Sequence, residues 1–331
     1  MVSPILAFRP ASVVARLAPR SGACPLSTRE LLGPAAERGL VLPIVRAPVG
    51  AVAHGALVAA KELQAAIGLA LPPGCAPEPW FDAVAAAADE VAAGLPIFLC
   101  AEVRVEGEGG TQVERAVGEA WRLVRAGVTH LAIDAAAAAP EERGRIVGDV
   151  AAAAVEHGAC IDVVVPLADG AQAGRRAGAV LDELARRGAA ADLASVRCLP
   201  PADDGEARLQ AGALARICQA LKGIPVMRRG PVTPALLDLL RGSPVKACED
   251  GGAVAARALS LVPEAARAAQ DAPGESRRDP LAAAVAALDP GAVDQLEARA
   301  YVDALDFLDR LGAAGGAPAI SRALEARLAE R

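Results

Sequence analysis

The chain has 331 residues, of which 53% are hydrophobic, 22% charged and 2% aromatic, and its net charge is −6. This composition provides enough apolar surface for a sizeable core and excludes the class of disordered chains. The acidic balance and the few aromatic residues disfavour a nucleic-acid partner, which calls for basic patches and stacking platforms. No apolar run is long enough and free enough of charged residues and proline to be a membrane span. We therefore expect neither nucleic acid nor membrane as a partner.

The seven cysteines indicate a reducing compartment. Their number is odd, no CxxC pair occurs, and several lie inside apolar runs that resemble strands. This pattern is typical of buried free thiols rather than of a disulfide framework. No secretion-signal pattern is present in the first 20 residues. We expect a cytoplasmic protein.

Short β-branched runs alternate with longer alanine-rich segments of helical periodicity. The predicted strands are residues 41–45, 66–71, 96–101, 129–134, 160–166, 194–199, 224–228 and 244–248. The predicted helices between them are residues 79–93, 111–126, 140–157, 171–187, 205–222 and 234–241. Eight strand–helix units with short connections predict a closed (β/α)8 TIM barrel. A doubly wound sheet is the alternative, but no glycine-rich phosphate turn follows the first strand.

The barrel is predicted to span residues 27–270, between an N-terminal extension, 1–26, and a C-terminal helical extension, 271–331. Residues 270–280 are rich in Pro, Gly and charge and read as an exposed link. Within the extension, residues 300–311 place Tyr301, Ala304, Leu308 and Leu311 on one helical face. This face either packs on the barrel or forms a dimer arm.

Several segments of the chain, in order, resemble one enzyme family. They are Gly39-Leu-Val-Leu-Pro43, Gly127-Val-Thr-His-Leu-Ala-Ile-Asp134, Gly223-Ile-Pro-Val-Met-Arg-Arg-Gly-Pro-Val-Thr-Pro234, Pro244-Val-Lys-Ala-Cys248 and Leu311-Gly-Ala-Ala-Gly315. Together they are similar to the opening, the fourth, seventh and eighth strands and the C-terminal ending of class II (metal-dependent) fructose- and tagatose-bisphosphate aldolases. The resemblance covers about residues 27–317 and implies the same (β/α)8 fold.

The resemblance implies a zinc ion held by three histidines, which polarises the substrate carbonyl. At the Asp-His pair that ends the family's third strand, this chain has Glu102 and Val103. Where the seventh strand supplies a ligand histidine before two glycines, Arg228, Arg229 and Gly230 stand instead. The sixth strand also ends without a histidine. The usual zinc site is therefore absent from the sequence, and we predict no cofactor and no metal ligands.

The chain has three histidines, His54, His130 and His157, and none matches a ligand position. We expect them to be surface or packing residues.

The two phosphate-binding turns of the family are altered as well. The first is Arg229-Gly-Pro-Val232, in which Pro231 has no backbone N–H to donate. The second is Cys248-Glu-Asp-Gly251, which puts two carboxylates beside the expected phosphate. A sugar bisphosphate is therefore a poor substrate hypothesis.

Strand alternation predicts which side chains face the barrel axis. Glu102 matches an inward catalytic position, so Cys100 should share its face. By the same matching, further residues should face inward or line the mouth: Arg46, Asp134, Arg228, Lys246 and Cys248.

Three interpretations of this cluster stay open. In the first, paired charges form a plug. In the second, a diverged site has Glu102, Asp134 and Lys246 as catalytic residues. A small anionic metabolite would then be bound by Arg46, Arg228, Gly230 and Cys248. In the third, Cys100, Cys198 and Cys248 hold a soft metal.

We therefore expect a degenerate class II aldolase-like protein without conventional zinc-dependent activity, a structural or regulatory pseudoenzyme subunit. It would be a homo-oligomer or the partner of a related aldolase subunit. The alternative is an active aldehyde-lyase, which makes or breaks carbon–carbon bonds, with a diverged substrate and an altered metal or none.

Overall fold

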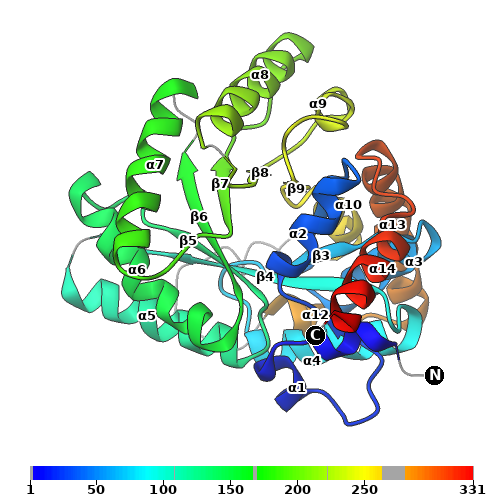
Figure 1. Ribbon diagram of the computed structural model, residues 1–331. Coiled ribbons are helices and arrows are strands. Elements are labelled where there is room, and N and C mark those ends of the chain that lie inside the picture. The colour runs from blue at the N-terminus through cyan, green and yellow to red at the C-terminus, as the bar shows by residue number, and fades with distance from the viewer. Residues whose placement is uncertain (1–2, 108, 167–169, 222, 263–279, 331) are drawn as a thin grey trace.

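The eight predicted strands are all present and close into a parallel barrel. The computed structural model describes residues 3–107, 109–166, 170–221, 223–262 and 280–330. Consecutive strands from β2 to β9 pair in parallel, and β9 pairs with β2 to close the ring (Figure 1). The strands are β2 Leu42–Arg46, β3 Ile67–Ala70, β4 Pro96–Arg104, β5 His130–Asp134, β6 Cys160–Pro166, β7 Leu193–Arg197, β8 Val226–Arg229 and β9 Ala247–Glu249. The prediction of a (β/α)8 barrel is confirmed.

Helices surround the barrel. They are α2 Thr28–Glu37, α3 Gly50–Glu62, α4 Pro77–Val91, α5 Gly110–Arg125, α6 Pro140–His157, α7 Gly170–Arg186, α8 Asp204–Ala220, α9 Pro234–Leu240 and α10 Ala253–Ala258. Three short elements precede them: η1 Pro4–Phe8, α1 Ala11–Arg16 and β1 Cys24–Pro25. After α10 come η2 Leu259–Leu261, α12 Pro280–Ala286, α13 Pro290–Arg310 and α14 Gly316–Ala329. Among the described residues, no helix combines the length and the apolarity needed to cross a bilayer.

Local chemistry explains where the helices begin and end. Pro140 and Pro234 start α6 and α9, at positions where the missing N–H has no intrahelical partner to lose. The Thr233 hydroxyl accepts a hydrogen bond from the backbone N–H of Leu236 and caps α9. Gly158 ends α6 in the left-handed conformation, with φ of 70°. The predicted alternation of strands and helices follows from these signals.

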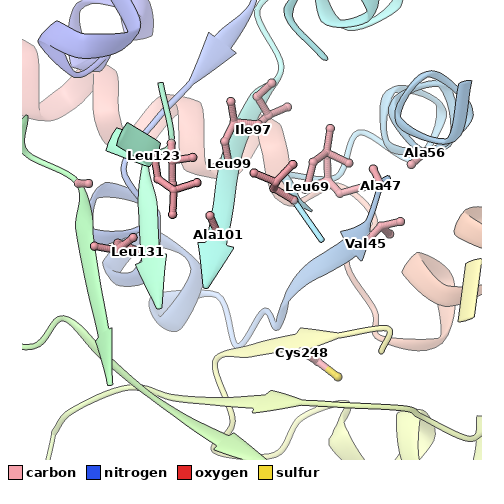
Figure 2. Packing of buried hydrophobic residues seen from close by; sticks show 14 of the residues in the cluster. Val45, Ala47, Ala56, Leu69, Ile97, Leu99, Ala101, Leu123, Leu131 and Cys248 are labelled. Atoms are coloured by element: carbon pink, nitrogen blue, oxygen red, sulfur yellow. The ribbon is translucent and has the colours of Figure 1, made fainter. Parts of the chain in front are cut away.

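The outward face of the strands packs against the helices. Val45, Leu69, Leu99 and Leu131, on β2, β3, β4 and β5, belong to one buried cluster between the two layers (Figure 2). Because side chains alternate along a strand, the residues beside them face the barrel interior. The interior cluster includes Leu42, Ile44, Phe98, Cys100, Cys160, Leu193, Met227 and Ala247. Apolar side chains therefore fill the part of the interior nearer the strand starts.

Both ends of the chain close the barrel floor, at the starts of the strands. Ile5 and Phe8 of η1, Leu31 of α2, and Ile320 and Leu324 of α14 all join the interior cluster. Figure 1 shows α14 beside α2, and β1 pairs with the start of β4. The N-terminal extension and the last helix thus share one core with the barrel. The boundary expected at 270/271 and most of the expected link, 270–280, lie outside the described residues.

The long helix α13 packs along α3 on the side of the barrel (Figure 1). Ala304, Leu308 and Leu311 are buried there. The close approach depends on Gly55 of α3, where a Cβ atom would lie 2.4 Å from the carbonyl oxygen of Glu297. Residues of the apolar face predicted over residues 300–311 thus lie against α3, and the dimer arm stays a prediction. The oligomeric state stays a prediction.

Candidate functional site

The carboxyl ends of the barrel strands bring eight charged side chains together. They come from seven strands: in β2, β4, β5, β7, β8 and β9 the inward position nearest the strand end is charged, β4 has a second charged inward residue, and β6 adds a deeper carboxylate. The residues are Arg46, Glu102, Arg104, Asp134, Asp162, Arg197, Arg229 and Glu249. We call this set the mouth network. Its four arginines and four carboxylates balance in charge.

Arg229 of β8 lies at the centre of the network and is 5% exposed. Its Nη2 contacts Asp162 Oδ2 at 2.8 Å and its Nη1 contacts Glu249 Oε2 at 3.1 Å and Glu102 Oε2 at 3.9 Å. Its Nε donates to the Ser195 hydroxyl at 2.9 Å. Burial alone would lower the pKa of Arg229, but the three carboxylates outweigh it and raise the pKa further. The guanidinium is thus permanently charged.

Arg197 of β7 crosses the barrel mouth. Its Nη2 contacts Glu102 Oε1 of β4 at 2.7 Å and Asp134 Oδ2 of β5 at 2.9 Å, although neither strand is adjacent to β7. Burial would raise the pKa of Glu102, but the charge of Arg229 and the hydrogen bond from Arg104 outweigh it and lower the pKa. Glu102 is therefore held as an ionised partner of arginines rather than poised near neutral pH for acid–base transfer.

The turn after β9 holds its own carboxylate. Asp250 is 1% exposed and accepts hydrogen bonds from the backbone N–H groups of Arg46, Gly252 and Val254, at 3.1, 2.9 and 2.9 Å. Burial raises its pKa to about 6, against the effect of these hydrogen bonds. The turn also lies against the turn after β8, since a Cβ on Gly251 would be 2.3 Å from the Pro231 nitrogen. The backbone donors at the start of α10 are thus already occupied by an anionic side chain.

A buried polar chain leads from the network toward the barrel floor. His130, expected to be a surface or packing residue, is fully buried and faces inward. Its Nε2 lies 3.1 Å from Asp162 Oδ2, and its Nδ1 lies 2.9 Å from the hydroxyl of Thr28 at the start of α2. Burial would raise the pKa of Asp162, but Arg229 and His130 outweigh it and lower the pKa. His130 therefore helps keep a fully buried carboxylate ionised.

The predicted inward positions of Glu102, Cys100, Asp134 and Arg46 are confirmed, but that of Arg228 is wrong. Arg228 is fully buried on the outward face, where it donates to the Gln210 side chain and to the carbonyls of the turn after β8. The physical reason is the strand register.

β8 turns its odd-numbered residues inward, so Arg229 reaches the mouth in place of Arg228. Sequence reasoning missed Arg229 and Arg197 as mouth residues. The signal that could have found them is the alternation of side chains: steps of two from the interior residues Met227 and Leu193 lead to Arg229 and Arg197.

The predicted inward positions of Lys246 and Cys248 are wrong for the same reason. Ala247 of β9 faces the interior, so Cys248 joins the outer cluster shown in Figure 2. Lys246 shares that face and approaches Cys218 of α8; burial raises the pKa of this thiol to about 11, and the lysine charge opposes the rise. Gly230 does lie at the mouth, with φ of 109°, and a Cβ there would be 2.2 Å from the carbonyl oxygen of Cys198.

The structure does not bring the three candidate thiols together. Cys100 faces the interior, whereas Cys198 and Cys248 face the helices. Burial raises the pKa of Cys198 to about 11 and that of Cys248 to about 12, so both are neutral thiols. Within the described residues, no three or more His, Cys, Asp or Glu side chains have the arrangement of a metal site. The described donors therefore do not fit the zinc ion that the resemblance implies.

The structure resembles solved aldolases. The YdjI aldolase from Escherichia coli K12 superposes with a TM-score of 0.60 at 14% identity, over 87% of this chain and 98% of that chain. A Coccidioides immitis protein named as a fructose-1,6-biphosphate aldolase gives 0.57 at 14% identity, over 87% and 96%. The chain has the fold of these aldolases. A Sinorhizobium meliloti 1021 protein named as a probable tagatose 6 phosphate kinase gives 0.55 at 16% identity, over 87% and 98%.

No protein-family model and no curated protein matches the sequence. The likeness to these aldolases is therefore one of fold, and the chemistry of the aldolase-like barrel depends on its own residues.

Proposed function

We propose that this aldolase-like barrel lacks zinc-dependent aldolase activity and serves as a structural or regulatory subunit. The observation that carries the proposal is the position of Arg229. It ends β8 directly before Gly230 and beside Arg228, where the resemblance calls for a ligand histidine, and its guanidinium occupies the centre of the mouth. A guanidinium has no lone pair to give a metal and carries a positive charge that repels a dication.

The second support comes from the phosphate turns. In the turn after β9, the carboxylate of Asp250 accepts the N–H groups of Gly252 and Val254, which a phosphate would otherwise take. In the turn after β8, Pro231 has no N–H to offer. A sugar bisphosphate would therefore meet a carboxylate where its phosphate group should bind, and the two would repel each other.

Metal content and cleavage activity test the proposal together. The chain is purified from zinc-supplemented culture, its metal is measured by mass spectrometry, and cleavage of fructose and tagatose bisphosphates is followed with and without chelator. We expect well below one zinc ion per chain and no cleavage that zinc restores. Stoichiometric zinc together with chelator-sensitive cleavage would overturn the proposal in favour of an active lyase.

The Arg229→His variant sharpens this experiment, because it supplies a nitrogen ligand at the inward position of β8, next to Arg228, to which the resemblance points. We expect it to stay inactive, since Arg197 still crosses the mouth and Asp250 still occupies the second phosphate turn. Zinc-dependent turnover by this variant would mean that the remaining ligands are in place after all. The parent chain, prepared in parallel, is its control.

A further inference from the structure

The charges of the mouth network lie in two layers. Arg46, Arg104 and Arg197 expose 35%, 53% and 33% of their side chains, whereas Glu102 and Glu249, which they contact, expose 10% and 2%. We call these three the rim arginines. The carboxylates lie beneath the guanidinium groups, so an anion that approaches the mouth from solvent meets positive charge first. In the lower dielectric at the barrel end, this order of charges attracts anions although the network is balanced overall.

The rim arginines also keep hydrogen-bond donors for a ligand. A guanidinium has five N–H groups. Arg104 donates to Glu102 through Nε, and Arg46 donates to Glu249 through Nη2. Arg197 donates through its Nη2 to Glu102 and Asp134. Within the described part of the chain, the other terminal nitrogens of these three side chains make no protein hydrogen bond. These donors are available to an anion above the mouth.

The three guanidinium groups occupy two positions on the rim. Arg104 and Arg197 both contact Glu102 Oε1, which places them side by side. Arg46 lies apart, on β2, and among the described residues the ion pairs that join it to them run through Glu249, Arg229 and Glu102. A ligand that satisfies both positions needs an anionic group at each end.

We propose that the rim arginines bind a small di- or tricarboxylate across the barrel mouth. A carboxylate accepts two parallel N–H bonds from a guanidinium, and this geometry suits isolated arginines on a rim. A phosphate would gain most from a turn of backbone N–H groups, and the turn at the start of α10 is occupied by Asp250. The inference goes beyond the proposed function, because a non-catalytic barrel needs no ligand of this class.

Calorimetric titration tests the inference, with succinate and citrate as probes and inorganic phosphate and fructose bisphosphate as comparisons at matched ionic strength. We expect citrate and succinate to bind the parent chain and phosphate to bind more weakly. Arg104→Gln should weaken citrate binding about tenfold, as expected for the loss of a charge-assisted pair. Its matched control is Arg299→Gln on α13, which removes an arginine of 54% exposure that is likewise paired with a carboxylate.

Several results would overturn the inference. They are no heat of binding with either carboxylate at millimolar concentration, equal affinity in parent and Arg104→Gln, or an equal loss in the Arg299→Gln control. Phosphate binding as tight as citrate, with the same dependence on Arg104, would overturn the ligand class. Because Arg104 is half exposed, its variant should fold, and circular dichroism checks this. The aldolase assay is separate, so a failure here leaves the proposed function standing, and zinc-dependent cleavage would not remove the anion site.

Discussion

Replacing Arg229 with methionine removes the cation at the centre of the mouth network while nearly keeping its volume. The side chain is 5% exposed and contacts Asp162, Glu249 and Glu102 at 2.8, 3.1 and 3.9 Å. Breaking a buried ion pair by removing one partner costs about 3–5 kcal/mol, because the other charge stays buried and uncompensated. Two nearly inaccessible carboxylates lose their shared partner here, so we expect a loss in the upper part of that range.

Urea unfolding followed by circular dichroism measures this loss. The matched control is Arg104→Met, which removes a 53% exposed arginine from the same Glu102 and should cost about 0–1 kcal/mol. The pH dependence provides a second readout. Arg229 lowers the pKa of Asp162 and of Glu102 against the effect of burial. In the parent, these ionised carboxylates therefore stabilise the fold at neutral pH, and this stabilisation is lost only when the pH falls through their lowered pKa values. Without Arg229, burial raises the pKa of these carboxylates, so the variant takes up protons as the pH falls and the gap between variant and parent should shrink toward pH 4.

Two outcomes would refute this reasoning. If Arg229→Met is as stable as the parent at pH 7, the buried carboxylates do not depend on the arginine for their charge. If it loses no more than Arg104→Met, burial does not set the cost of breaking the pair. A constant gap between pH 7 and pH 4 would show that lost packing rather than lost charge explains the destabilisation.

Two further substitutions separate the network's parts. Glu102→Gln should lower the free energy of unfolding by about 1–3 kcal/mol, less than Arg229→Met, because Arg197 keeps Asp134 as a partner and Arg229 keeps two carboxylates. A Glu102→Gln chain as stable as the parent in thermal melts would instead favour a catalytic carboxylate. The free energy of unfolding of Asp250→Asn should rise relative to that of the parent as the pH rises from about 4 to 6. The folded pKa of Asp250 is raised to about 6, so the folded parent holds a proton that the unfolded chain has lost and becomes less stable across that window, by at most about 3 kcal/mol. Urea titrations at several pH values measure the difference between the two chains, and a difference that does not change with pH contradicts the raised pKa.

The barrel could be predicted from sequence because its local signals agree. Each predicted strand lies within three residues of the observed one at both ends, from Leu42–Arg46 to Ala247–Glu249. Prolines at helix starts and left-handed glycines at helix ends mark the boundaries independently of the apolar pattern. Both faces of a barrel strand are buried, however, so the apolar pattern marks a strand without telling which of its faces points inward.

The mouth was harder to predict for that reason. On β8 both arginines are buried, and Arg228 and Arg229 differ only in the direction of their side chains. Matching to the family's motif pointed to Arg228, whereas the register of β8 beside β7, with Ser195 opposite Met227, puts Arg229 inward. The polar contacts of His130 were not predictable either, because its partners Thr28 and Asp162 are 102 and 32 residues away in sequence.

The two adjacent arginines of β8 are both buried, but their guanidinium groups have different kinds of partners. Arg228 points toward α8 and is held by uncharged acceptors, the Gln210 side chain and two backbone carbonyls of its own turn. Arg229 points toward the axis and is held by carboxylates from three other strands. A shift of β8 by one residue would exchange these environments and leave each cation with the wrong partners. The network therefore helps to fix the strand register, because Arg229 finds its three carboxylates only when it faces the axis.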